Sequence, residues 1–196
     1  MCLLINESRD REMSKILHIN SCPRKESRTK RLADALLKKL GNYEELKLYQ
    51  EKILPLNEER LEHRTALIEK GNYDDECFKY AKQFADADII VLSAPFWDLS
   101  FPAVLKVYIE NIYITGIVSR YSDDGSPLGL CKAKKLYFVT TAGGPFDERF
   151  GYDYIKALAL EYFGIKEVAL IKAEMLDIDE NDAEAILLNA MKNICL

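Results

Sequence analysis

Residues 88–94 read Asp-Ile-Ile-Val-Leu-Ser-Ala, with an uninterrupted apolar run from Ile89 to Leu92. A strand with one face in water alternates polar and apolar side chains, whereas a strand covered on both faces is apolar throughout. Strands of the second kind lie at the centre of parallel sheets. We therefore expect residues 88–94 to form the middle strand of such a sheet.

Strands and helices are predicted to alternate on both sides of this stretch. Short apolar segments predict further strands at residues 15–20, 45–49, 135–141 and 167–172. Periodic apolar positions predict helices at residues 27–40, 57–70, 74–85, 103–115, 152–163 and 180–194. Gly41 would end the first of these helices, and Asp179 would cap the last. Five strands alternating with helices predict an α/β fold, a five-stranded doubly wound parallel sheet of flavodoxin-like order with helices on both faces.

Length and composition indicate one domain. The 196 residues contain no low-complexity run and no linker-like stretch, so we expect a single domain at residues 14–196. The 27 basic and 32 acidic residues leave a net charge of −5 without a block of like charges. Nucleic acid is therefore a poor candidate partner.

The cysteines and the first residues indicate the cellular compartment in which the protein is expected to work. Five cysteines, an odd number, form no Cys-x-x-Cys pair, so we expect free thiols in the cytoplasm and no metal centre. Residues 1–13 hold only a short apolar stretch, too short for a signal peptide or a membrane span. We expect no membrane association, and either a disordered leader at residues 1–13 or a natural start at Met13.

Ligands of open parallel sheets bind beyond the carboxyl ends of the strands, so the loops after the first, third and fourth predicted strands are the candidate site. The first loop brings the hydroxyls of Ser21, Ser27 and Thr29 to a helix N-terminus, where the free amides and the helix dipole favour an anion such as phosphate. Arg28 adds positive charge. The alternative is that Ser27 or Thr29 only caps the helix.

The second and third loops have different character. Pro95-Phe96-Trp97-Asp98-Leu99 places aromatic side chains just past a buried strand, where a flat ligand could cover them; alternatively, Phe96 and Trp97 close the core. In Thr141-Ala142-Gly143-Gly144, the adjacent glycines permit positive φ and close approach of the backbone to a ligand, although they could form a simple turn. FMN has a phosphate, a flat ring and a polar ring edge, and each of the three loops matches one of these parts. The first loop offers a phosphate site, the second an aromatic shelf, and the third a stretch of backbone without side chains.

These segments resemble the FMN-dependent NADH:quinone oxidoreductases, or azoreductases, of the flavodoxin-like superfamily. Ser21 with Ser27-Arg28-Thr29 resembles the family's phosphate-binding serine and S-x-[ST] triplet, Pro95 to Leu99 its P-M-[YW]-N-F flavin loop, and Thr140 to Gly144 its T-S-R-G-G segment. Residues 113–130 resemble the G-x-T-F-R-Y…G…G-L region that borders the active site across the dimer. The chain departs from the family pattern at Asp98, Leu99, Ala142 and Ser119, where Asn, Phe, Arg and Phe are usual or frequent.

The resemblance implies a two-electron ping-pong enzyme. NADH or NADPH would give a hydride to FMN, and a quinone or azo compound would then take the electrons. Pro95, Phe96, Trp97, Asp98 and Leu99 would line the flavin ring, Thr141, Ala142, Gly143 and Gly144 would meet its polar edge, and Tyr121 would help roof the acceptor site. The departures at Leu99 and Ser119 are expected to change the acceptor pocket, and a carboxylate at Asp98 would tend to lower the flavin potential. No protein acid or nucleophile is required.

The helix predicted at residues 103–115 is apolar around much of its circumference, which predicts a covering partner and hence a homodimer. The alternative cover is the segment at residues 121–134. Two other function classes remain open: an FMN electron carrier or flavin-binding regulator, and a non-flavin binding module in which Trp97 belongs to the core.

Overall fold

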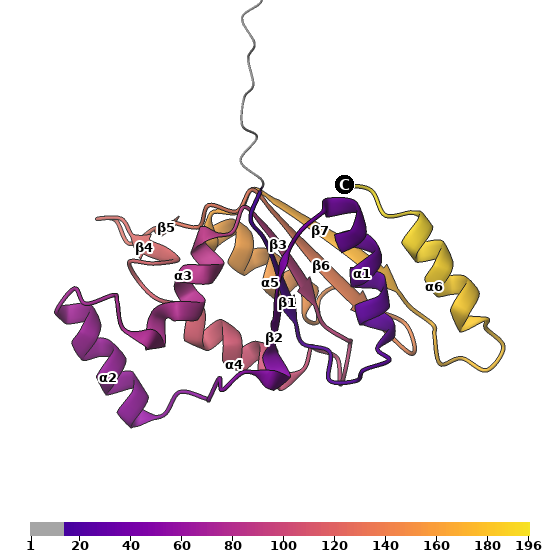
Figure 1. Ribbon diagram of the computed structural model, residues 1–196, viewed down its shortest axis with the longest axis horizontal. Helices are drawn as coiled ribbons and strands as arrows, with labels where there is room; N and C mark the ends of the chain where they lie inside the picture. Colours follow the sequence, from indigo (N-terminus) through magenta and orange to yellow (C-terminus); the bar gives the residue numbers. More distant parts are fainter. Residues whose placement is uncertain (1–13) are drawn as a thin grey trace, which may run out of the picture.

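A five-stranded parallel sheet forms the centre of the molecule. The computed structural model describes residues 14–196, so the predicted leader at residues 1–13 lies outside the described residues. The strands are β1 (Ile16–Asn20), β2 (Glu44–Lys47), β3 (Ile89–Ser93), β6 (Lys135–Thr141) and β7 (Glu167–Ala173). Their spatial order is β2-β1-β3-β6-β7, and every neighbouring pair is parallel (Figure 1). The order reverses between β1 and β3, which confirms the predicted doubly wound, flavodoxin-like sheet.

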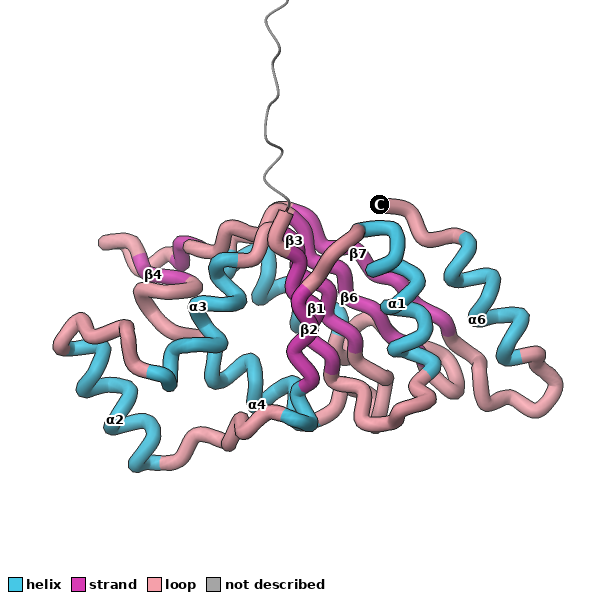
Figure 2. The backbone as a smooth tube through the Cα atoms, viewed as in Figure 1, coloured by secondary structure: helices cyan, strands magenta, loops and turns pink. Residues whose placement is uncertain are grey.

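Helices cover both faces of this sheet. One face carries α1 (Arg28–Leu40) and α6 (Ala183–Lys192), and the other carries α3 (Lys79–Asp86), α4 (Ala103–Ile112) and α5 (Tyr152–Ala157). α5 continues into a short π-helix, Leu158–Phe163. The remaining α-helix, α2 (Glu58–Glu69), has no fully buried residue and lies at the edge of the molecule (Figure 2). Within residues 14–196, no helix combines the length and the apolar character that crossing a bilayer requires.

Side chains of the central strands alternate between two hydrophobic cores. In β3, Ile90 and Leu92 pack with α3, α4 and α5, whereas Val91 packs with α1 and α6. In β6, Phe138 packs with α3, α4 and α5, whereas Val139 packs with α1 and α6. Because both faces are dry, an apolar residue is required at every position, which explains the run at residues 89–92.

The structure differs from the sequence prediction mainly at element ends. The last helix begins at Ala183, and its cap is Asp182, whose carboxylate accepts a 2.9 Å hydrogen bond from the Ala185 amide. The expected cap, Asp179, lies in the loop before the helix. Both aspartates suit a cap, so composition alone could not choose between them.

A short hairpin that was not predicted from the sequence follows α4. Its strands are β4 (Ser119–Tyr121) and β5 (Pro127–Gly129). Gly129 lies so close to the backbone of Gly164 that a Cβ on it would be 2.1 Å from the Gly164 nitrogen. Since Gly164 shortly precedes β7, this contact holds the hairpin at the amino ends of the strands (Figure 1).

Candidate functional site

The loops that follow β1, β3 and β6 meet at the carboxyl end of the sheet, as predicted. They enclose a small cavity of about 120 Å³. Its lining contains nine of the predicted site residues: Ser27, Arg28, Thr29, Pro95, Phe96, Trp97, Thr141, Ala142 and Gly143. The other lining residues are Pro23, Arg24, Glu26, Leu176 and Asp177. The cavity lining does not include the other predicted site residues, Ser21, Asp98, Leu99, Gly144 and Tyr121.

The N-terminus of α1 forms one wall. Ser27 is the N-cap, and its hydroxyl oxygen accepts a 3.3 Å hydrogen bond from the Lys30 amide. Capping and ligand binding are compatible here, because the Ser27 hydroxyl can still donate its proton. The amides of Arg28 and Thr29 have no hydrogen-bond partner within residues 14–196. These groups, at the positive end of the helix dipole, suit an anion.

A pair of threonines joins this wall to β6. The hydroxyls of Thr29 and Thr141 lie 2.6 Å apart, and both side chains are largely buried. Only one of the two hydroxyls can donate in this bond, so the other keeps a proton for a ligand. Ser21 has a different position from the one expected: it is fully buried, and its hydroxyl donates to the Ser93 carbonyl at 2.8 Å. It therefore fastens the β1 loop to β3 beneath the cavity.

Arg28 does not offer an unpaired charge. Its guanidinium donates to the Leu176 carbonyl at 2.9 Å and to the Asp177 carboxylate at 2.5 Å. Asp177 would repel a bound phosphate, and this ion pair offsets that repulsion. The positive charge of Arg24, also in the lining, is opposed by Glu26.

The loop after β3 makes a tight two-residue turn. Trp97 and Ser100 exchange two backbone hydrogen bonds of 2.8 Å, and the residues between them have positive φ, 49° at Asp98 and 60° at Leu99. This is the geometry of a type I′ turn, in which glycine or asparagine is usual. Leucine is strained in that region, and such strain concentrates at functional sites.

The turn exposes an apolar surface beside the cavity. Trp97 is 39% exposed and Leu99 58% exposed. Phe96 instead packs edge-to-face on Phe146, with ring centroids 4.9 Å apart. The core interpretation therefore applies in part to Phe96, whereas Trp97 and Leu99 form a shelf open to a ligand.

The glycine loop after β6 matters for a different reason from the one predicted. Neither Gly143 nor Gly144 has positive φ. Gly143 is needed because a Cβ there would lie 2.3 Å from a carboxylate oxygen of Asp177, whereas a Cβ on Gly144 would meet nothing within 4 Å. The Gly143 and Gly144 amides donate no hydrogen bond within the described residues.

Sequence reasoning missed the loop after β7. The amides of Met175, Leu176 and Asp177 donate to the carbonyls of Gly144, Ala142 and Gly143 at 2.9 to 3.2 Å. This series of bonds closes the site with Leu176 and Asp177. Ligands of open parallel sheets bind beyond the carboxyl ends of the strands, and β7 is the fifth strand of this sheet. The same reasoning applied to the loop after β7 would have identified Leu176 and Asp177.

Tyr121 is not part of this site within one chain. It lies in the hairpin at the amino ends of the strands, and it is 52% exposed. Ser119, in the same strand, is buried and does not border the cavity. These positions could contribute to an acceptor pocket only across a subunit interface.

Comparisons with known proteins show the family to which the chain belongs. Residues 14–195 match the model of the flavodoxin-like fold family. The FMN-dependent NADH:quinone oxidoreductase 2 of Clostridium acetobutylicum is 37% identical, over 92% of this chain and 96% of that protein. The corresponding enzyme of Coprothermobacter proteolyticus is 34% identical over the same shares of the two proteins. The azoreductase structure from Bacillus anthracis strain Sterne is 26% identical, with a TM-score of 0.75 over 92% of this chain and 96% of that one. The chain therefore belongs to the flavodoxin-like family and, within it, to the FMN-dependent NADH:quinone oxidoreductases.

Proposed function

We propose that this chain binds FMN at the carboxyl end of its sheet and reduces quinones, azo compounds or both with electrons from NADH or NADPH. The observation that carries the proposal is the cavity at the α1 N-terminus with the exposed shelf of Trp97 and Leu99 beside it. The names of the relatives, FMN-dependent NADH:quinone oxidoreductase and azoreductase, support the same assignment.

The residues present fit FMN part by part. A cavity of about 120 Å³ suits a phosphate group and not a whole nucleotide. That phosphate would be bound by the Ser27 hydroxyl, by the one hydroxyl of the Thr29–Thr141 pair that keeps its proton, and by the amides of Arg28 and Thr29.

The flavin ring would lie outside the cavity, on the shelf that the type I′ turn presents. Trp97 and Leu99 would support the ring and exclude water from one side of it. The amides of Asp98, Gly143 and Gly144 would be available to its polar edge, because none of them donates elsewhere within the described residues. Pro95, Phe96 and Ala142 would shape the space between phosphate and ring.

The redox chemistry would be supplied by FMN, to which the nicotinamide gives a hydride before the acceptor takes the electrons in a separate step. The protein's part is to hold and orient the flavin and to keep one face open for each substrate in turn. The free thiols of the described cysteines suit the reducing cytoplasm, which we propose as the compartment.

The visible absorption spectrum of the purified protein, followed by anaerobic addition of NADH or NADPH, tests this function. We expect an oxidised-flavin spectrum that bleaches with the nicotinamide and returns with a small quinone, and steady turnover when both substrates are present. An electron carrier would bind FMN without such turnover. Colourless protein that takes up no added FMN would refute the assignment.

A further inference from the structure

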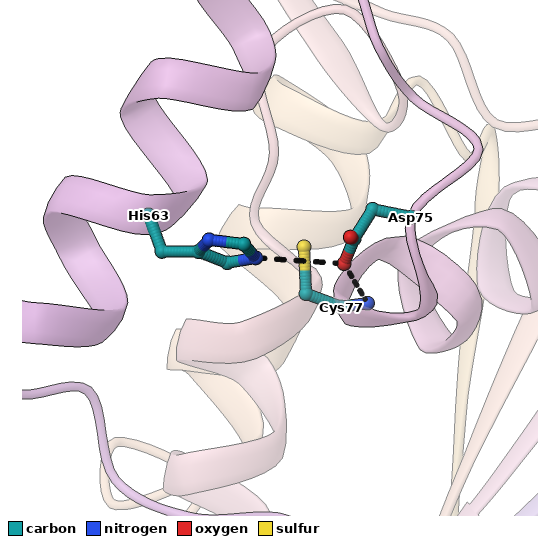
Figure 3. Close-up of side chains that lie close together, drawn as sticks. All are labelled: His63, Asp75 and Cys77. Carbon is teal, nitrogen blue, oxygen red and sulfur yellow. Dashed lines mark hydrogen bonds and ion pairs between the residues drawn. The ribbon is translucent and has the colours of Figure 1, made fainter.

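A second group of chemically reactive side chains lies far from the flavin site, between α2 and the segment that precedes α3. His63 belongs to α2, and Asp75 and Cys77 lie at the start of the 3₁₀ turn Glu76–Phe78 (Figure 3). One ligand atom from each residue, a ring nitrogen, a carboxylate oxygen and the sulfur, lies within 4.8 Å of the other two. The His63 Nε2 and Asp75 Oδ1 atoms are 3.7 Å apart.

The local backbone explains how residues so far apart in sequence come together. Gly71, with φ of 64°, ends α2 in a left-handed conformation, and the Asn72 amide donates to the Leu67 carbonyl at 2.9 Å. This Schellman-type ending reverses the chain direction. The returning segment then passes beside the helix it has just left, close to His63.

Asp75 and Cys77 are held in place by independent contacts. The Asp75 carboxylate accepts a 2.9 Å hydrogen bond from the Cys77 backbone amide, which fixes the Asp75 side chain relative to the Cys77 backbone. Phe78, the next residue, is fully buried and packs against Tyr73 with ring centroids 5.5 Å apart. The backbone that carries two of the three groups is therefore anchored in the core.

We propose that His63, Asp75 and Cys77 form a three-ligand site for Zn²⁺. Imidazole, carboxylate and thiolate are the ligands that zinc prefers, and a tetrahedral ion with bonds of about 2.0 to 2.3 Å separates its ligand atoms by roughly 3.3 to 3.8 Å. The His63–Asp75 separation of 3.7 Å already lies in that range. The Cys77 sulfur lies within 4.8 Å of the other two ligand atoms.

The surroundings leave a fourth position open. His63 and Cys77 border a cavity of about 370 Å³, which is also lined by Glu59, Arg60 and Arg64. A water molecule or a small ligand could complete the coordination from that side, as in zinc sites that keep an open position. The Arg64 guanidinium donates to the Glu110 carbonyl at 3.3 Å, so its charge is partly engaged away from the cluster.

A dication would also bring positive charge to the Asp75 carboxylate, whose ligand oxygen lies within 4.8 Å of the Cys77 sulfur. A bound metal would replace the thiol proton and place two positive charges between the thiolate and the carboxylate. Glu59 opposes the repulsion that Arg60 and Arg64 exert on the ion.

Such an ion would fasten α2 to the rest of the molecule. This helix has no fully buried residue, and Leu67 and Ile68 are its only side chains that pack against a described core cluster. A link from His63 to the anchored 3₁₀ turn would oppose local opening of α2. This consequence is independent of flavin binding, so the proposal does not depend on the proposed function.

Metal titration of the full chain, loaded with FMN or as purified and freed of metal by a chelator, tests this site. Zn²⁺ is added in competition with a chromogenic chelator, and Co²⁺ is used as a coloured substitute that reports thiolate ligation and tetrahedral geometry. We expect one equivalent to bind, a thiolate-to-Co²⁺ charge-transfer band, and slower amide exchange in α2 with Zn²⁺. Cys77→Ser and His63→Gln should each lower the affinity at least about tenfold and remove the protection of α2.

Asp75→Asn separates metal binding from folding, because an asparagine side chain can still accept the Cys77 amide hydrogen bond. It should keep the wild-type circular dichroism and lose affinity. Asp74→Asn and Cys195→Ser, which change an exposed acid and an exposed cysteine outside the cluster, are the matched controls and should bind as wild type. Absence of stoichiometric Zn²⁺ uptake, or uptake of equal affinity in Cys77→Ser, His63→Gln and Asp75→Asn, would overturn the proposal.

Discussion

Thr29 is the residue where the two sides of the phosphate cavity meet. Its hydroxyl shares a single hydrogen bond with Thr141, so the pair can offer one further proton to a ligand. Ser27 also caps α1 and keeps its own proton. Replacing both Ser27 and Thr29 by alanine should weaken FMN binding by about 1 to 3 kcal/mol, because phosphate oxygens would lose hydrogen bonds. Fluorescence titration of the flavin-free protein with FMN measures this change.

Thr65→Ala on the exposed face of α2 is a control for this experiment, since it removes a hydroxyl far from the cavity. Loss of the Ser27 cap should also lower the free energy of unfolding, by about 0.5 to 2 kcal/mol, so stability and affinity must be measured separately. If the double variant binds FMN as tightly as wild type, the assignment of this cavity to the phosphate is wrong.

His18 is a fully buried histidine in β1 and does not line the cavity at the carboxyl end of the sheet. Its Nε2 atom lies 2.9 Å from the Ser93 hydroxyl, and its Nδ1 atom has no hydrogen-bond partner within the described residues. Burial lowers the pKa of His18 to about 4, although the nearby Glu45 carboxylate opposes the shift. The folded protein therefore holds this imidazole neutral at physiological pH.

Because the folded pKa lies below the ordinary value of 6.5, the unfolded chain binds the proton more readily. The stabilising contribution of neutral His18 is complete above about pH 6.5 and is lost as the pH falls toward 4. The total loss is about 3 kcal/mol. Urea unfolding between pH 7.5 and 4.5 should show this slope, and His18→Gln should reduce it. A wild-type slope in His18→Gln would contradict the assignment.

At the scale of the elements, the site depends on how the loop after β7 packs on the loop after β6. Three backbone hydrogen bonds join these loops, and Asp177 approaches Gly143 where any side chain would collide with it. The ends of β6 and β7 place the two loops next to each other, and the contact between these loops closes one side of the cavity.

Gly143→Ala should therefore displace Asp177, break its ion pair with Arg28 and destabilise the protein by about 1 to 3 kcal/mol. Adding Asp177→Ala should recover part of that loss, because the nearest remaining atom, the Asp177 Cβ, is 3.2 Å from the new methyl group. Thermal unfolding of the two single variants and the double variant gives the coupling energy. Gly144→Ala, which meets nothing within 4 Å, is the matched control. Additive effects of the two changes would show that the loops do not meet as described.

At the scale of the whole molecule, the apolar face of α4 is explained mostly within one chain. Leu105, Tyr108, Ile109 and Ile112 are buried, packed with α3 and with the turn Leu48–Gln50. Residues 121–134, the expected alternative cover, contribute Cys131 and Ala133 to the same core cluster, and the homodimer stays a prediction. The case for a homodimer now depends on the hairpin, which exposes Tyr121, Leu128 and Leu130 at the opposite end of the sheet from the cavity.

We predict a homodimer in which Tyr121 of one subunit borders the acceptor site of the other. Tyr121→Ala should leave FMN affinity unchanged and raise the KM for a quinone about 2- to 10-fold, as expected for loss of one aromatic contact. Tyr43→Ala, at a similarly exposed tyrosine before β2, is the control. Light scattering should give twice the mass of one chain. A monomer with full quinone turnover would exclude this arrangement.

The alternation of strands and helices can be predicted from the sequence alone, as can the buried central strand and the three loops that form most of the site. Those features depend on side-chain periodicity and local turn chemistry, which are readable from neighbouring residues. Only the folded structure shows which distant residues are neighbours. It places Asp177 against Gly143 and His63 beside Asp75 and Cys77, and it places Tyr121 away from the cavity of its own chain. These contacts join residues that are separated in sequence. They depend on the path of the folded chain, so no pattern among neighbouring residues predicts them.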